Sequence, residues 1–200
     1  INLAIAGIAV GTVALPNLAK NVKLKKQNII DKLQNRSIEL CLLLSLPAAF
    51  GLLIASEQIV NSLFGYGSFN IEDIYYTSLA LIFFAFGVPA FALIKVLSNF
   101  YFARNDTKFP FYVSFITMLI NIIISLSFFK KHGFIIIPIA TSISSWVNSI
   151  FLYIYLHKED YFRINKKLII QIIRVAISTI TMGILLQNLL SYFDSELSFE

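Results

Sequence analysis

The segment YFARNDTKFP, residues 101–110, places five polar or charged side chains in a row in a chain otherwise rich in Ile, Leu, Phe and Val. It lies between two continuous apolar stretches, residues 75–100 and 109–129. Each stretch is long enough to cross the hydrocarbon core of a bilayer, which takes about 20 helical residues. The segment therefore predicts a tight turn between two transmembrane helices.

Charged side chains are expected to anchor this predicted turn. The carboxylate of Asp106 can accept hydrogen bonds from the first backbone N–H groups of the second helix. Pro110 then falls in the first turn of that helix, where its missing N–H costs no hydrogen bond. Arg104 and Lys108 flank the cap, and we expect them to hold both helix ends at the lipid headgroups.

The rest of the chain has the same apolar character. It is 58% apolar and only 14% charged, with a mean hydropathy of +0.78, whereas soluble domains average about 25% charged residues. Apolar stretches occupy residues 1–19, 38–64, 75–100, 109–129, 133–156 and 168–190. They are continuously apolar and do not alternate, which indicates helices and not strands. The predicted fold class is an all-α, polytopic transmembrane helix bundle. Because the chain opens inside an apolar run, we expect it to be a fragment of a longer protein.

Only the sequence KKHG, residues 130–133, separates the fourth and fifth stretches. A single long helix through both would place two adjacent lysines at mid-bilayer, which is costly. The sequence therefore favours a tight turn at this point.

The basic residues predict an orientation. If the stretches cross the membrane alternately, the loops 20–37, 101–108 and 157–167 share one face and carry twelve of the 16 lysines and arginines. The opposite face has Lys130 and Lys131. By the positive-inside rule, the first face is cytoplasmic. This distribution explains the net charge of +5 without a nucleic-acid partner. Loop 20–37 interleaves bases with apolar residues, which leaves open a solvated connector or an amphipathic segment lying on anionic lipid.

Lys95 lies deep in the third stretch. It precedes Arg104 by nine residues, or about 13 Å along a helix. A lysine at this depth can face a cavity and contact a substrate, or it can have a purely structural role with its ammonium reaching toward the membrane surface. Both interpretations remain open from the sequence.

Small polar residues recur in the fourth and fifth stretches. Asn121 and Ser125 share a helical face, as do Thr141 and Ser145. Such side chains usually hold transmembrane helices together through hydrogen bonds. A sodium site is the alternative, although a carboxylate ligand is missing from this set. The sequence shows no pattern typical of catalysis, so we predict that the protein is not an enzyme.

Taken in order, several motifs resemble the MurJ/MviN family of lipid II flippases. The matching segments are GIAVGTVALPNLAK (7–20), LCLLLSLPAAFGLLI (40–54), IVNSLFGYGSFN (59–70), VPAFALIKVLSNFYFARNDTKFP (88–110) and ATSISSWVNSIFLYIYL (140–156). The most specific are the lysine-containing third stretch running into FYFARNDTKFP, and VALPNLAK at the end of the first. The resemblance implies a fourteen-helix transporter of the multidrug/oligosaccharidyl-lipid/polysaccharide (MOP) flippase class, of which this chain would be helix eight (second part) to helix thirteen. Residues 1–156 would then belong to the transporter core, and residues 157–200 would be a cytoplasmic linker and the first helix of a C-terminal pair.

The resemblance also implies a function. The whole protein would carry the undecaprenyl-linked peptidoglycan precursor lipid II from the cytoplasmic to the periplasmic leaflet of the bacterial inner membrane, by alternating access. Lys95 matches a lysine in the family's helix ten and is the candidate for the positive charge of the substrate cavity. Asn121 and Thr141 match a sodium site of some members. Ser125 stands where those members have an aspartate. Coupling to sodium or to the membrane potential therefore stays open, and no other cofactor is expected. Lipid II and membrane lipids are the expected partners. Alternatives are another MOP-type exporter, either a polysaccharide-lipid flippase or a drug/cation antiporter, and a membrane scaffold without transport.

Overall fold

The computed structural model describes the backbone of residues 10–197 and the side chains of residues 14–192, and the first nine residues of the predicted first stretch lie outside this range. The helices are α1 (Val10–Lys23), α2 (Gln27–Ile54), α3 (Ser56–Phe64), α4 (Ile71–Phe102), α5 (Lys108–His132), the short 3₁₀ helix η2 (Gly133–Ile135), α6 (Ile136–Lys158) and α7 (Lys166–Leu197). Short turns join them. The all-helical prediction is confirmed for the part of the chain that the structure describes.

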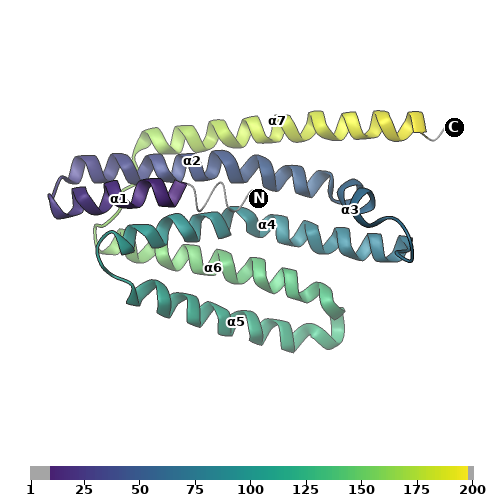
Figure 1. The fold of residues 1–200 in the computed structure, drawn as a ribbon, viewed down its shortest axis with the longest axis horizontal. Helices are drawn as coiled ribbons and strands as arrows, with labels where there is room; N and C mark the ends of the chain where they lie inside the picture. Colours follow the sequence, from purple (N-terminus) through teal and green to yellow (C-terminus); the bar gives the residue numbers. More distant parts are fainter. Residues whose placement is uncertain (1–9, 198–200) are drawn as a thin grey trace.

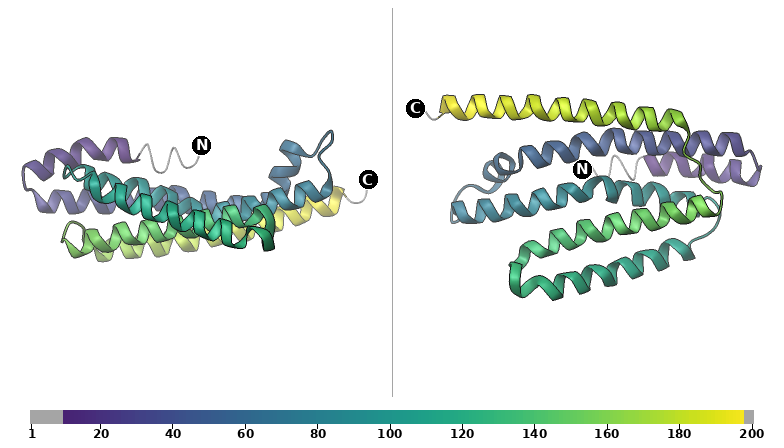
Figure 2. Two further views of the ribbon diagram at one scale, coloured as in Figure 1. Left: turned by 90° about the horizontal axis from the view of Figure 1, so that it is seen from below. Right: turned by 180° about the vertical axis from the view of Figure 1, so that it is seen from behind.

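The five long helices lie side by side in a row (Figure 1). Contacts between neighbours give the order α5, α6, α4, α2 and α7, and α1 packs against both α2 and α4. When the row is viewed edge-on, α1 and α3 lie on the same side of it (Figure 2). Successive long helices run in opposite directions, so the turns before α2, α5 and α7 meet at one end, which we call the basic end.

Among the residues that the structure describes, four helical stretches are apolar and long enough to cross a membrane: Gln27–Ile54, Ile71–Phe102, Lys108–Lys158 and Lys166–Tyr192. The third of these is a hairpin, because α5 and α6 fold back on each other at Gly133. Gly133 has a φ of 63°, a conformation that glycine adopts without a steric penalty. The predicted reversal of the chain is confirmed, but it lies at Gly133–Ile135, because residues 130–132 still form the end of α5.

The predicted loop 20–37 is wrong in extent. Helix α2 already begins at Gln27 and continues without a break into the apolar stretch, so neither a connector nor a segment lying flat on lipid describes residues 27–37. With 28 residues, α2 is about 42 Å long, longer than a hydrocarbon core of about 30 Å. Its first turns therefore extend beyond the apolar layer.

The second predicted stretch, residues 38–64, is not one helix. It breaks at Ala55, after which the nine-residue helix α3 turns out of the row and packs against α4. Hydropathy does not mark this break because Ile59, Val60 and Leu63 keep the sequence apolar beyond it.

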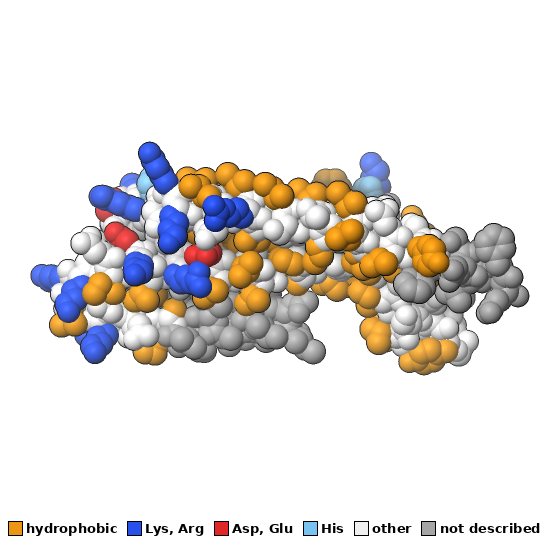
Figure 3. All heavy atoms as spheres, turned by 90° about the horizontal axis from the view of Figure 1, so that it is seen from above, with side chains coloured by type: hydrophobic (Ala, Val, Ile, Leu, Met, Phe, Trp, Pro, Cys, Tyr) orange, Lys and Arg blue, Asp and Glu red, His pale blue; other side chains and the backbone are white. Residues whose placement is uncertain are grey.

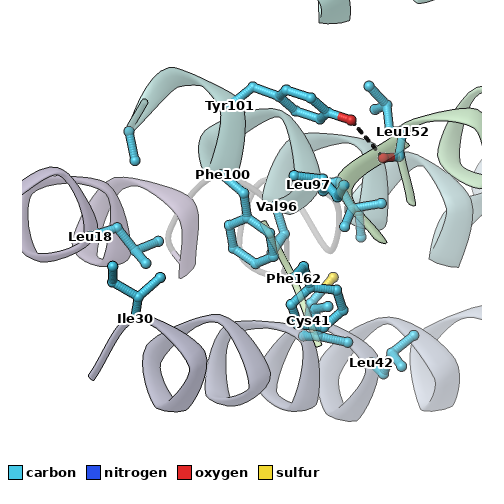
Figure 4. Packing of buried hydrophobic residues seen from close by; sticks show 14 of the residues in the cluster. Leu18, Ile30, Cys41, Leu42, Val96, Leu97, Phe100, Tyr101, Leu152 and Phe162 are labelled. Carbon is cyan, nitrogen blue, oxygen red and sulfur yellow. Dashed lines mark hydrogen bonds between the residues drawn. The ribbon is translucent and has the colours of Figure 1, made fainter. Parts of the chain in front are cut away.

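A core of buried apolar side chains joins the helices near the basic end (Figure 4). Phe100 and Tyr101 of α4 are fully buried, and the Tyr101 hydroxyl donates to the carbonyl of Leu152 in α6 at 2.7 Å. Phe162, in the segment before α7, is also fully buried and lies 5.7 Å from Phe100 between ring centroids. The core therefore ties the linker 159–165 to the bundle. In lipid, such close packing is the main attraction between helices, since the surrounding acyl chains are equally apolar.

Candidate functional site

Lys95 opens onto a pocket between α1, α4 and α5. The pocket has a volume of about 620 Å³. It is lined by Leu15, Ile94, Lys95, Ser98, Asn99, Phe102, Thr107, Pro110, Phe111 and Ser114. Lys95 is exposed and forms no ion pair with any side chain that the structure describes. The ammonium is therefore available to a partner in the pocket.

The helical period of α4 explains this placement. Lys95, Ser98, Asn99 and Phe102 recur every three or four residues, so they share one face of the helix. The intervening residues Val96, Leu97, Phe100 and Tyr101 are buried in the core. One face of α4 thus fixes the helix in the bundle, while the other presents a cation and two polar side chains.

The chemistry of this pocket favours an anionic group. Apart from Lys95, its lining is neutral, so one positive charge stands in largely apolar surroundings. Attraction between opposite charges is stronger in such surroundings than in water. A lysine ammonium with three donors binds phosphate oxygens as a point charge. Ser98 and Asn99 were missed by the sequence analysis, although their spacing from Lys95 was visible there.

The predicted turn after α4 is present at residues 103–107. Asp106 Oδ1 accepts the backbone N–H groups of Lys108 at 3.1 Å and Phe109 at 3.2 Å, which confirms its capping role. Lys108 is exposed. Contact of Arg104 and Lys108 with lipid headgroups stays a prediction.

Arg104 does more than flank the turn. Its guanidinium donates to the carbonyl oxygens of Phe100 and Tyr161, each at 2.7 Å, and lies 4.6 Å from the centroid of the Tyr161 ring. Burial lowers the pKa of Arg104, but an arginine remains charged in proteins. This side chain therefore connects the end of α4 to the linker before α7, a role that its sequence position did not reveal.

The polar residues of α5 and α6 meet as the sequence predicted. Asn121 Nδ2 donates to the hydroxyls of Thr141 at 3.1 Å and Ser144 at 3.2 Å. Asn148 Nδ2 donates to Thr117 Oγ1 at 3.1 Å. These bonds confirm that the polar side chains join the two helices.

In this arrangement the same residues present no carboxylate to a sodium ion. Asn121 turns its NH₂ group toward both hydroxyls, while its oxygen accepts from Ser125 at 3.3 Å. The adjoining pocket, of about 260 Å³, has only neutral residues in its lining, and the described residues hold no cluster of three His, Cys, Asp or Glu side chains. Hard cations prefer oxygen ligands that include carboxylates. Sodium binding at Asn121 and Thr141 therefore stays an untested prediction.

Comparisons with known proteins agree with the motifs. The family model "Lipid II flippase MurJ" matches residues 1–199. A protein of Rhizobium meliloti, named "Probable lipid II flippase MurJ", is 36% identical over 181 residues, covering 90% of this chain and 34% of the relative. A protein of the same name from Rickettsia prowazekii is 32% identical over 191 residues, covering 96% of this chain and 38% of the relative.

A solved structure has the same fold. It is described as "Lipid II flippase MurJ, inward closed conformation" and superposes with a TM-score of 0.75 at 24% identity, covering all of this chain and 45% of the other. The chain thus spans about a third of the length of the curated relatives it matches. Because the family model matches this membrane-protein chain along almost the whole length of the chain, the chain belongs to the lipid II flippase MurJ family.

Proposed function

We propose that the full-length protein containing this chain moves lipid II from the cytoplasmic to the periplasmic leaflet of the bacterial inner membrane. The observation that carries this proposal is Lys95, a cation on the pocket face of α4 that forms no ion pair among the described side chains. Lipid II is an undecaprenyl-pyrophosphate-linked molecule, so its headgroup needs a positive charge inside the membrane. Membership of the MurJ family indicates lipid II as the cargo, and the cation in the pocket suits the pyrophosphate of lipid II.

The physical task explains why such a pocket is needed. A polar group exposed to the hydrocarbon core costs several kcal/mol, and a large sugar and peptide headgroup exposes many. A protein that moves this headgroup must offer it a hydrated, partly cationic passage. This passage opens to one side of the membrane in one state of the protein and to the opposite side in the other. The pocket beside Lys95 is the part of that passage that this chain supplies.

The orientation follows from the charges at the two ends. The basic end holds the turns 103–107 and 159–165, and its excess of lysine and arginine favours the cytoplasmic side. The hairpin turn at Gly133–Ile135 then lies on the periplasmic side. In this orientation Lys95 lies nearer the cytoplasmic surface, where the precursor is loaded.

Complementation tests the proposal directly. The full-length protein is expressed in a bacterium conditionally depleted of its own lipid II flippase, and growth and precursor levels are followed. Rescue with normal precursor levels is the expected result. Failure to rescue, with the protein confirmed in the membrane, would support another exporter of the same fold or a scaffold without transport.

A further inference from the structure

A second pocket lies at the basic end, between the starts of α2 and α7, and the proposed function does not use it. Its volume is about 330 Å³. It is lined by Lys32, Asn35, Arg36, Glu39, Asn165, Lys167, Leu168 and Gln171. Figure 3 shows lysine and arginine side chains gathered at one end of this face of the molecule. We call it the α2–α7 pocket.

The α2–α7 pocket has an excess of positive charge. Three of its side chains are cationic, and one, Glu39, is anionic. Glu39 is already paired, because Arg36 donates to it at 2.7 Å. Lys32 and Lys167 are exposed and form no ion pair among the described side chains. Two positive charges therefore remain for a ligand.

Hydrogen bonds hold the walls of the pocket in place. Asn35 Nδ2 donates to the carbonyl of Arg163 at 2.9 Å, and Asn35 Oδ1 accepts the backbone N–H of Asn165 at 3.2 Å. Asn165 Oδ1 in turn accepts the N–H of Leu168 at 2.7 Å and caps α7. The cations of α2 and α7 are thus kept on facing walls, and the start of α7 adds the positive end of a 32-residue helix.

The pocket lies where both helices change from polar to apolar. From Leu40 onward α2 is apolar for several turns apart from the buried Ser45, and Leu43, one turn after Glu39, is 47% exposed. On α7 the exposed apolar side chains beside and just beyond the pocket are Ile169, Ile170 and Ile173, and the exposed Arg174 adds one further cation at this level. Such a boundary marks the level of the lipid headgroups, and basic pockets between helices at this level bind anionic headgroups.

We propose that the α2–α7 pocket binds the phosphate of an anionic phospholipid from the surrounding leaflet. Lys32 and Lys167 contact the phosphate oxygens, Arg36 contributes its remaining N–H donors, and the exposed apolar side chains beyond the pocket contact the acyl chains. The ligand is a bilayer lipid and not free phosphate, because the cations stand directly at the edge of an apolar surface. This inference does not depend on the transported cargo.

Lipid selectivity of the full-length protein tests the proposal. The protein is reconstituted in bilayers of phosphatidylcholine with increasing phosphatidylglycerol, and a spin-labelled lipid of each kind reports its association relative to the bulk. In the double variant Lys32→Ala/Lys167→Ala, we expect the preference for phosphatidylglycerol to fall about tenfold, since each basic side chain near the surface contributes severalfold. Association of phosphatidylcholine should not change.

Matched variants separate this site from general surface charge. Lys23→Ala removes an exposed lysine at the same end that does not line the pocket, and it should retain the preference. The pair Lys32→Gln/Lys167→Gln repeats the test if the alanine variant does not fold. An unchanged preference in the folded double variant would overturn the proposal. So would displacement of the lipid by inorganic phosphate beyond the effect of chloride at equal ionic strength, because the ligand would then be the free anion.

Discussion

The two ends of the helix row are held together in different ways. At the basic end, side chains join segments far apart in the chain: Arg104 to Tyr161, Asn35 to Arg163 and Asn165, and Tyr101 to Leu152. At the opposite end, the turn between α3 and α4 is held locally, since Asn70 and Asp73 bond only to each other's backbone in a capping box. Gly65 likewise bonds back to Asn61, four residues earlier.

This difference indicates which parts of the chain move together. Bonds between distant segments make α2, α4 and the linker 159–165 one unit at the basic end. The printed hydrogen bonds of the opposite end stabilise a single turn, and its neighbours are joined to it by packing, as of α3 against α4 and of Tyr76 against Phe134. We therefore expect rearrangements within this chain to be larger at the end that holds α3 and the α5–α6 turn.

The largest effect is expected from Arg104→Ala. The change removes two charge-assisted hydrogen bonds and leaves the carbonyl of Tyr161 without its partner. We expect the free energy of unfolding to fall by about 2–3 kcal/mol, measured by denaturation of the purified full-length protein in detergent. Arg104→Lys keeps the charge but not the two-pronged geometry, so it should recover only part of the loss. Wild-type stability in Arg104→Ala would contradict a basic end held by long-range bonds.

Asn35→Ala should have the next largest effect. It removes the bonds to the carbonyl of Arg163 and the N–H of Asn165 at a site that is 5% exposed. A loss of about 1–2 kcal/mol is expected in the same assay. Asn28→Ala, an exposed asparagine in the first turn of α2, is the matched control and should change little. Equal effects of the two substitutions would show that the buried amide does not hold the linker.

At the opposite end, Asn70→Ala removes one half of the capping box of α4. The expected loss is about 1 kcal/mol, and Asn70→Asp should retain most of the stability because its carboxylate can accept the same N–H. Hydrogen exchange of the backbone should increase only in the first turns of α4. Increased exchange that reaches the basic end would mean that the two ends are coupled.

The smallest effect concerns pH. Arg163 donates two hydrogen bonds to Asp160 and holds the pKa of that exposed carboxyl below its usual 3.8. Because this pKa is lowered by folding, the contribution is present above about pH 3.8 and is lost as the pH falls through the lower, folded-state value. The difference in stability between the wild type and Asp160→Asn should thus shrink below pH 3.8. A difference that grows on acidification would contradict the pairing.

Hydropathy predicted the helices better than their ends. It located the turns at 103–107 and close to Gly133, because charged and small residues interrupt apolar runs there. It placed the start of α2 eleven residues too late, because Gln34, Asn35 and Ser37 look like loop residues but are buried against other segments. A helix continues wherever its backbone bonds and its packing allow, and neither requires an apolar sequence.

The candidate site was predictable in part for a similar reason. The depth of Lys95 follows from counting residues along one helix. Its pocket partners Leu15 and Phe111 come from α1 and α5, and a single sequence does not show which helices become neighbours. The bonds of Arg104 to the linker are hidden in the same way.

Lipid II flipping by the full-length protein with the substitution Lys95→Ala tests the central claim most directly. In reconstituted vesicles, we expect the rate to fall about tenfold, the effect of one lost charge-assisted contact, while insertion and folding stay normal. Lys95→Arg should keep more activity than Lys95→Ala, and Lys130→Ala, an exposed lysine at the opposite end, should flip at the wild-type rate. Undiminished flipping in folded Lys95→Ala would contradict the claim that this lysine supplies the positive charge for the passage of the headgroup.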